Sequence, residues 1–357
     1  MATLNYIGSK KSLLEFIDYV LKKINPEFKK TNKIKFLDGF AGSGIVGKYF
    51  NQKYGYNVFS NDMEYYSYVI SYALLKVEYT EKIKNKIEQL NILTKPIDEK
   101  KFNLITENYS EKGKEKRKFW TISNSQKADA IIENIKTELN NKTITDDEYM
   151  FLMASLVSSI DKYANTASVY GAYLKKYKSS SLKTFELKAI HTDNNIVNNN
   201  KNNNYNLDVN SETITNNEYD ITYFDPPYNN RQYSSNYHPL NFISKYDSSI
   251  IPYGKTGLLE NSNKSNYSIS KNVEETFKSL IEKINTKYIL LSYNNEGIMS
   301  SNTIRKILKK KGKTTLYKYE YKKFKSQSKQ ENETVYEYLY LCEVGKKGEY
   351  SSEIIEL

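Results

Sequence analysis

The stretch KIKFLDGFAGSGIVGKYF, residues 33–50, decides the expected fold. Its opening residues contain Ile34, Phe36 and Leu37 and predict a buried strand. The glycine-rich residues 39–44 predict a turn, and residues 45–50 predict a helix that packs on a sheet. A second strand is expected at residues 56–60 and a second helix at residues 64–75. Strand, glycine turn, helix, strand and helix in this order indicate an α/β sheet.

This pattern stops between residues 76 and 204. Charged helical segments dominate there, with one apolar helix expected at residues 148–160, and no strand alternates with helix as in a βαβ repeat. The polar run at residues 193–206, mostly asparagine, predicts a loop or linker. We therefore predict a mainly helical insert at residues 76–204, inside one α/β domain formed by residues 1–75 and 205–357.

Strand signals return after the insert. Residues 220–224 and 287–293 are apolar runs that predict buried strands. Residues 314–321 and 335–344 alternate apolar and polar side chains, and they are expected to pair through the polar turn between them. Residues 13–24, before the first strand, have helical apolar spacing.

The composition limits the class of protein. The chain has 357 residues, a net charge of +11 and a single cysteine, Cys342, so it has no internal disulfide and no cysteine-cluster zinc site. No apolar run reaches the length of about 18 residues that a membrane span needs, and the first residues lack a signal pattern, so a cytoplasmic location is expected. The positive charge fits a polyanionic partner such as nucleic acid. An AT-rich genome, which encodes many Lys, Asn, Ile and Tyr residues, explains it equally well.

Two kinds of ligand compete for the glycine turn. Residues 42–47 match the dinucleotide pattern GxGxxG, and Asp62 lies where such sites carry an acid, so a nicotinamide cofactor is one candidate. Asp38 opposes it, because a carboxylate at the strand end would repel a pyrophosphate at the helix N-terminus. S-adenosylmethionine has no phosphate and has a cationic amino acid end, so it suits Asp38, while Asp62 could accept hydrogen bonds from its ribose hydroxyls.

The segment Asp225-Pro226-Pro227-Tyr228 directly follows the predicted strand at residues 220–224. The prolines lack backbone donors and keep their carbonyl acceptors. The Asp225 carboxylate and the Pro226 carbonyl can therefore accept both hydrogens of an amino group and aim its lone pair at a methyl donor. Tyr228 offers a flat face on which an extruded base can stack. The alternative is a plain strand-ending proline turn that Asp225 caps.

With these motifs the chain resembles the Dam-like DNA adenine methyltransferases, in the alpha order of motifs. The stretches that carry the resemblance are residues 5–10 (N-terminal cofactor motif), 36–44 (glycine motif), 61–64 (ribose motif) and 225–228 (catalytic motif). Residues 229–233, 237–238 and 292–297 resemble a subset found in restriction–modification systems. The resemblance implies the S-adenosylmethionine-dependent methyltransferase fold, a Rossmann-like sheet of about seven strands with an antiparallel edge hairpin.

The resemblance also implies roles for single residues. Those expected to bind the cofactor are Tyr6, Gly8, Lys10, Asp38, Gly39, Phe40, Gly42, Gly44, Asp62, Met63 and Asp208. The expected catalytic residues are Asp225, Pro226, Pro227 and Tyr228, and no metal is expected. Those expected to contact DNA are Arg231, Gln232, Tyr233, Tyr237, His238, Tyr170 and Lys175. The turn predicted between residues 321 and 335 contains Lys322, Lys323, Lys325 and Lys329. These lysines either form a solvated charged run or contact the DNA backbone.

These observations predict a site-specific methyltransferase that moves a methyl group from S-adenosylmethionine to the exocyclic amine of adenine in duplex DNA. The expected setting is a restriction–modification system whose cognate restriction endonuclease acts separately, with the insert reading the target sequence. The alternatives are a cytosine-amine methyltransferase, which usually has serine in place of Asp225, and an RNA amine methyltransferase, which more commonly has asparagine there. An NAD-dependent oxidoreductase and a non-catalytic DNA-binding module are further alternatives, and the segment at residues 225–228 opposes both.

Overall fold

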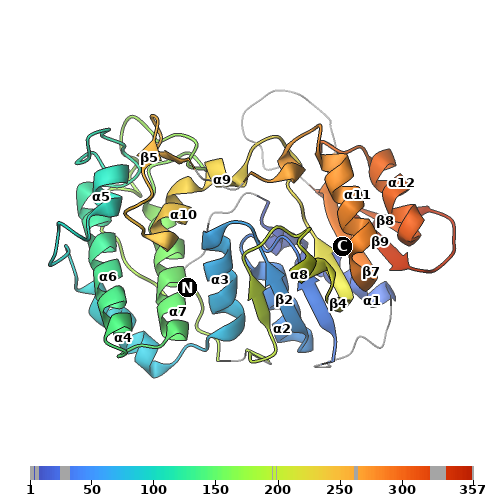
Figure 1. Cartoon of the computed structure of the whole chain (residues 1–357), viewed down its shortest axis with the longest axis horizontal. Coiled ribbons are helices and arrows are strands. Elements are labelled where there is room, and N and C mark those ends of the chain that lie inside the picture. The colour runs from blue at the N-terminus through green and yellow to red at the C-terminus, as the bar shows by residue number, and fades with distance from the viewer. Residues whose placement is uncertain are drawn as a thin grey trace.

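The structure is a computed structural model of the chain, and it describes residue 4 and residues 8–24, 33–194, 196–197, 199–260, 264–321 and 335–355. Within these residues the chain forms an eight-stranded sheet with helices on both faces and a bundle of helices beside one end of the sheet (Figure 1). No helix in these ranges is long and apolar enough to cross a membrane. The predicted α/β class is confirmed.

The sheet is mainly parallel, in the order β10-β8-β9-β7-β4-β1-β2-β3. Its strands are β1 (Lys35–Asp38), β2 (Asn57–Asn61), β3 (Asn203–Tyr205), β4 (Glu218–Phe224), β7 (Asn285–Asn294), β8 (Gly312–Tyr321), β9 (Val335–Val344) and β10 (Ser351–Ile355). Neighbouring strands are parallel except at β9, which is antiparallel to both β7 and β8. A separate hairpin is formed by β5 (Pro252–Tyr253) and β6 (Leu258–Leu259).

All the strands expected from the sequence are present, and β8 pairs with β9 as predicted. Two strands of the sheet were not predicted. β3 lies inside the asparagine-rich run that we expected to be a loop, and β10 pairs with β8, so the β8–β9 hairpin is not the edge of the sheet. The sheet therefore has eight strands rather than about seven. The side chains of β10 are exposed except at Ile355, so the strand has little apolar alternation.

The helices fall into two groups, those that cover the sheet and those beside it. They are α1 (Leu14–Ile24), α2 (Ile45–Tyr54), α3 (Tyr65–Lys76), α4 (Glu81–Asn91), α5 (Leu104–Tyr109), α6 (Ile122–Asn140), α7 (Asp146–Ile160), α8 (Glu212–Thr215), α9 (Tyr233–Asn236), α10 (His238–Lys245), α11 (Val273–Lys283) and α12 (Ser301–Lys311). Short 3₁₀ helices are η1 (Lys10–Leu13), η2 (Asp161–Tyr163) and η3 (Asn266–Ser268).

Alternate side chains of the central strands enter two different cores. Phe36 of β1 and Tyr223 of β4 pack with residues of α1 and α2, whereas Leu37 and Phe224, the next residue in each strand, pack with residues of α11 and α12. This alternation follows from the two-residue period of a strand. Both faces of the sheet centre are therefore covered, as the apolar strand sequences require.

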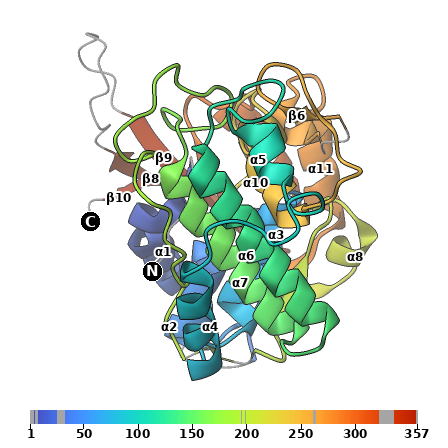
Figure 2. The ribbon, with the colours of Figure 1, turned by 90° about the vertical axis from the view of Figure 1, so that its left-hand side faces the viewer.

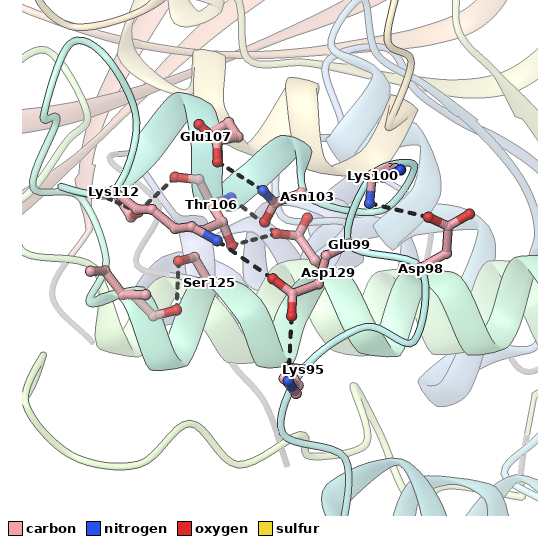
Figure 3. Close-up of polar contacts among 12 residues, drawn as sticks. Lys95, Asp98, Glu99, Lys100, Asn103, Thr106, Glu107, Lys112, Ser125 and Asp129 are labelled. Atoms are coloured by element: carbon pink, nitrogen blue, oxygen red, sulfur yellow. Dashed lines mark hydrogen bonds and ion pairs between the residues drawn. The ribbon is translucent and has the colours of Figure 1, made fainter.

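The helical bundle shares one core among three stretches of the chain. Helices α4–α7 pack with α3, which follows β2, and with α10, which follows β4 (Figure 2). Asp129 of α6 is fully buried and accepts hydrogen bonds from the amides of Ile105 (3.0 Å) and Thr106 (3.0 Å) at the start of α5 (Figure 3). It also accepts one from the hydroxyl of Tyr246 (2.7 Å), just after α10. One carboxylate thus ties three helices together.

Asn202 explains why the asparagine-rich run ends in a strand. Its fully buried side chain accepts a hydrogen bond from the amide of Val58 in β2 (2.9 Å) and donates to the carbonyls of Leu75 (2.8 Å) and Val197 (3.2 Å). The amide group therefore replaces missing backbone partners at the edge of the sheet and positions β3 beside β2.

Asn202→Ala should lower the free energy of unfolding by about 1–3 kcal/mol, because it leaves the buried Val58 amide without its acceptor. Urea denaturation followed by circular dichroism measures this change. Asn200→Ala, an exposed asparagine in the same run, is the control and should change the stability by less than about 0.5 kcal/mol. Equal stabilities of the two variants would contradict this role of Asn202.

Candidate functional site

The glycine turn joins β1 to α2 at the carboxyl edge of the sheet. Gly42 and Gly44 have positive φ angles of 53° and 70°, which glycine adopts without strain. The amide of Gly47 donates to Oδ2 of Asp38 (3.0 Å), and the amide of Gly42 donates to Oδ2 of Asp62 (2.8 Å). Backbone donors that a pyrophosphate would need are therefore already bonded to carboxylates.

The turn borders a cleft at this edge of the sheet. Its wall combines the segment before η1, the turn, the end of β2 and the Asp-Pro-Pro-Tyr segment. Among the residues predicted as functional, those that line it are Gly8, Lys10, Gly39, Phe40, Gly42, Asp62, Met63, Asp225, Pro227 and Tyr233. The structure thus brings both ends of the predicted site to one cleft.

Three predicted cofactor residues lie outside the wall of this cleft. Asp38 lies beneath the turn, and Gly44 packs against α3, where an added Cβ would lie 3.0 Å from Cδ1 of Leu74. Asp208 is exposed, and its Oδ1 accepts a hydrogen bond from the amide of Asn210 (2.9 Å). The predicted residues Tyr6, Lys322, Lys323, Lys325 and Lys329 lie outside the described residues.

Asp38 is a buried carboxylate with an unused acceptor. Its Oδ2 accepts the Gly47 amide, whereas its Oδ1 has no hydrogen-bond partner within the described residues. Burial raises the pKa of Asp38 to about 7, an effect that the Gly47 amide opposes and that Asp225 and Asp62 reinforce by repulsion. A cationic group in the cleft would relieve this cost, since an opposite charge favours the ionised carboxylate.

Asp225 and Lys10, which both line the cleft, form an ion pair with Nζ of Lys10 at 2.8 Å from Oδ2 of Asp225. Burial by itself lowers the pKa of Lys10, but attraction to Asp225 and to Glu337 outweighs it, so that the pKa is raised. Burial raises the pKa of Asp225, and Lys10 opposes that rise. The pair therefore favours the ionised carboxylate of Asp225.

Tyr228 is held by the segment that follows β7. Its ring lies edge-on to that of Tyr293, with the ring centroids 6.4 Å apart, and its carbonyl accepts a hydrogen bond from the amide of Ile298 (3.0 Å). Gly297 lies against Tyr293, since a Cβ added to Gly297 would lie 2.1 Å from Cε1 of Tyr293. The family-like residues 292–297 therefore belong to the segment that packs against Tyr228 and supports it.

The residues predicted to contact DNA have different surroundings. Arg231 and Lys175 are exposed. The side-chain amide of Gln232 donates to the carbonyl of Ser265 (3.0 Å) and accepts from its amide (2.8 Å), so Gln232 fixes one loop to another. Tyr233 lines the cleft.

For Tyr170, Tyr237 and His238 the prediction of direct DNA contact needs correction, because their side chains are fully buried. The hydroxyl of Tyr170 donates to Asp161 (2.7 Å), and Tyr237 stacks on Tyr233 with centroids 6.1 Å apart. Both ring nitrogens of His238 lie within hydrogen-bond distance of backbone carbonyls. A polar motif match gives no information on burial, and these three residues belong to the core.

Sequence reasoning missed several residues of the cleft. Glu64 lines it, is hydrogen-bonded to Asn241 of α10, and has a pKa that burial raises to about 8. Val209 and Ser265 also line it, and Glu337 of β9 interacts electrostatically with Lys10. Glu64 follows Asp62 closely enough to be found with the ribose motif, but the others come from distant segments without a motif. No cluster of metal-ligating side chains exists in the described ranges.

A glycine-turn cleft beside an Asp-Pro-Pro-Tyr segment, at the carboxyl edge of a mainly parallel sheet, defines a methyltransferase that acts on an amino group. Residues 6–307 match the D12 class N6 adenine-specific DNA methyltransferases, and the chain belongs to this family. It is therefore an adenine-specific DNA methyltransferase. The comparisons do not support a cytosine-amine, RNA-amine or nicotinamide-dependent enzyme, nor a non-catalytic module.

Individual relatives extend this result over nearly the whole chain. It is 38% identical over 353 residues to the Type II methyltransferase M.NlaIII of Neisseria lactamica. The aligned region covers 95% of this chain and 99% of that protein. It is 36% identical over 341 residues to the Type II methyltransferase M.CviAII of Paramecium bursaria Chlorella virus 1, covering 95% and 98%. It is 37% identical over 350 residues to the Type II methyltransferase M.FokI of Planomicrobium okeanokoites, covering 94% of this chain and 52% of that protein.

Lys10→Gln should slow methyl transfer by about 100-fold and move the acid limb of the pH–rate profile to higher pH. The reason is that Asp225 loses the cation that favours its ionised form, so its pKa rises and the active carboxylate is lost at a higher pH. Single-turnover methylation of duplex DNA between pH 5 and pH 8 measures both effects. The neighbouring exposed Lys11→Gln is the control, and an unshifted acid limb in Lys10→Gln would contradict this role of the ion pair.

Proposed function

We propose that this DNA adenine methyltransferase takes its methyl group from S-adenosylmethionine bound in the cleft and serves as the modification half of a restriction–modification system. The printed names of its relatives, Type II methyltransferases and modification methylases, support that setting. A cognate restriction endonuclease would act as a separate protein, and the enzyme would work in the cytoplasm. The observation that carries the proposal is that Asp225 and the glycine turn share one cleft.

The residues present suit S-adenosylmethionine. Asp38 lies beneath the turn that borders the cleft, and its carboxylate would attract the cationic amino acid end. Asp62, which lines the cleft just after β2, can accept hydrogen bonds from two ribose hydroxyls. Phe40, Val46 and Val209 give the cleft apolar surface suited to a purine ring. The bound cofactor would supply an electrophilic methyl group on a sulfonium, so the chain itself has to position the acceptor amine.

Asp225 and Pro226 carry out this positioning in the proposal. The carboxylate of Asp225 and the carbonyl of Pro226 accept the two hydrogens of the adenine amine, which turns its lone pair towards the cleft. Because the nitrogen becomes cationic as the new bond forms, the attraction to Asp225 strengthens in the transition state. Lys10 holds the Asp225 carboxylate in place through their ion pair. The extra proton can leave to water after transfer.

Tyr228 and the helical bundle provide binding of the DNA in the proposal. The base has to leave the duplex to reach Asp225, and the half-buried ring of Tyr228 can stack on the extruded adenine. The insert at residues 76–204, placed between the two parts of the α/β domain at residues 1–75 and 205–357, would read the target sequence. Exposed Lys175 of the insert and Arg231 after the catalytic segment are available to phosphates.

Asp225→Ala should reduce the rate of methyl transfer by about 100- to 1,000-fold while leaving the affinity for S-adenosylmethionine nearly unchanged, because the lost acceptor acts in the chemical step. Single-turnover methylation measures the rate, and calorimetry measures the affinity. Tyr228→Phe should be much milder than Tyr228→Ala, since stacking needs the ring rather than the hydroxyl. A near wild-type rate for Asp225→Ala would reduce the segment to a structural turn.

The affinity for S-adenosylmethionine should weaken as the pH falls below about 7, by about tenfold per pH unit. Burial raises the pKa of Asp38 to about 7 in the free protein, so protonation below that pH removes the negative charge that attracts the cationic amino acid end. Calorimetry between pH 5.5 and pH 7.5 checks this.

Asp38→Asn should bind the cofactor weakly and with little dependence on pH over the same range. Asp208→Asn, at a solvent-exposed carboxylate, is the control and should keep the wild-type pH dependence. A flat pH dependence of the wild-type affinity would refute the assignment of Asp38 to the cationic end.

A further inference from the structure

The hairpin of β5 and β6 lies beside the bundle, next to α5 and α10 (Figure 1), and presents a compact exposed surface. We call residues 251–257 the hairpin turn. The turn exposes Ile251 (75% exposed), Tyr253 (46% exposed) and Lys255, whereas Pro252 and Gly257 are buried. Gly254 and Gly257 have positive φ angles of 68° and 78°. An aliphatic side chain, an aromatic ring and an ammonium group therefore point outward from one short segment.

Three buried side chains of the bundle hold the backbone of this hairpin turn. Nη2 of Arg117 donates to the carbonyls of Pro252 (3.3 Å) and Gly254 (2.9 Å). The hydroxyl of Tyr109 donates to the carbonyl of Gly257 (2.8 Å), and Nε2 of His238 lies 2.8 Å from the carbonyl of Thr256. These carbonyls of the turn are bonded to the bundle, while the side chains of Tyr253 and Lys255 are exposed to solvent.

This support is costly for a surface hairpin. Arg117 is 2% exposed, and no carboxylate pairs with it in the part of the chain that the structure describes. Burying a cation against neutral carbonyls costs free energy, and Gly257 allows the close approach, since an added Cβ would lie 2.9 Å from the ring of Tyr109. A loop that merely connected α10 to η3 would not need such support, so the position of the turn itself matters.

The turn is also fixed relative to the cleft. His238, which holds Thr256, is the first residue of α10, two residues after α9. Later in the chain, Ser265 lines the cleft and exchanges two hydrogen bonds with Gln232, which directly precedes α9. The hairpin turn and Ser265 are therefore each hydrogen-bonded to the segment that follows Asp225. An extruded base in the cleft would leave its duplex next to these elements.

We propose that the hairpin turn at residues 251–257 contacts the target duplex beside the extruded adenine and contributes to the sequence preference of the enzyme. This inference rests on the proposed function of the cleft. The ammonium of Lys255 suits a phosphate, while the ring and hydroxyl of Tyr253 suit a base edge in a groove. Recognition of the target then depends on chain after the catalytic segment as well as on the insert at residues 76–204.

The test is the double variant Tyr253→Ala/Lys255→Ala, compared with Ile354→Ala/Lys347→Ala. The control pair removes one exposed apolar side chain and one exposed lysine from β10 and the loop before it. Three quantities are measured for each protein: the affinity for a labelled duplex at several salt concentrations, the affinity for S-adenosylmethionine, and the methylated sites in plasmid DNA by modified-base sequencing.

The turn variant should bind the duplex about tenfold more weakly, with the salt slope reduced by about one, and methylate a broader set of sites. Its melting temperature and cofactor affinity should match those of the control, since both altered side chains are exposed. Duplex affinity equal to that of the control would overturn the proposal. Weaker binding with unchanged sites would overturn the assignment of sequence preference. The measurement of duplex affinity does not depend on methyl transfer. If the proposed chemistry were wrong, the wild-type protein would bind the duplex without methylating it, and the two failures would be told apart.

Discussion

The parallel pairing of β1 with β4 brings the two halves of the site together. The register places Asp38 opposite Tyr223, and the amide of Gly39 donates to the carbonyl of Tyr223 (3.0 Å). The glycine turn and Asp225 therefore leave the same edge of the sheet although most of the helical bundle separates them in sequence. This pairing also brings the carboxylates of Asp38 and Asp225 close enough to repel each other. The ammonium of Lys10, paired with Asp225, offsets this repulsion.

Much of the α/β domain could be predicted because its signals are local. The apolar runs of β1, β4 and β7 lie in the buried centre of the sheet, and the glycine turn is read directly from adjacent residues. Motifs in the same strands and turns predicted an adenine-specific DNA methyltransferase, and the family match over residues 6–307 confirms this class. By contrast, β3 was missed because its stability comes from the distant contacts of Asn202 rather than from apolar alternation.

The site itself could be predicted only as far as its motifs extend. The lining of the cleft by Gly42, Asp62 and Asp225 matches the motif positions. The burial of Tyr170 and His238 was not visible in the sequence, because a motif records which residues recur and gives no information on which face of an element they occupy. The contacts of Glu64 with Asn241 and of Lys10 with Asp225 join residues far apart in the chain, so no spacing rule reveals them.

The shared core of the helical bundle has a consequence for biosynthesis. Helices α4–α7 leave the ribosome before α10, yet Leu240 and Phe242 of α10 belong to the same fully buried core as Leu156 of α7. Until the chain has been made through α10, the apolar surface that these residues cover stays in water. The bundle can therefore close only when β4 and the Asp-Pro-Pro-Tyr segment have also emerged. Folding of the helical part and assembly of the cleft are thus coupled in time on the ribosome.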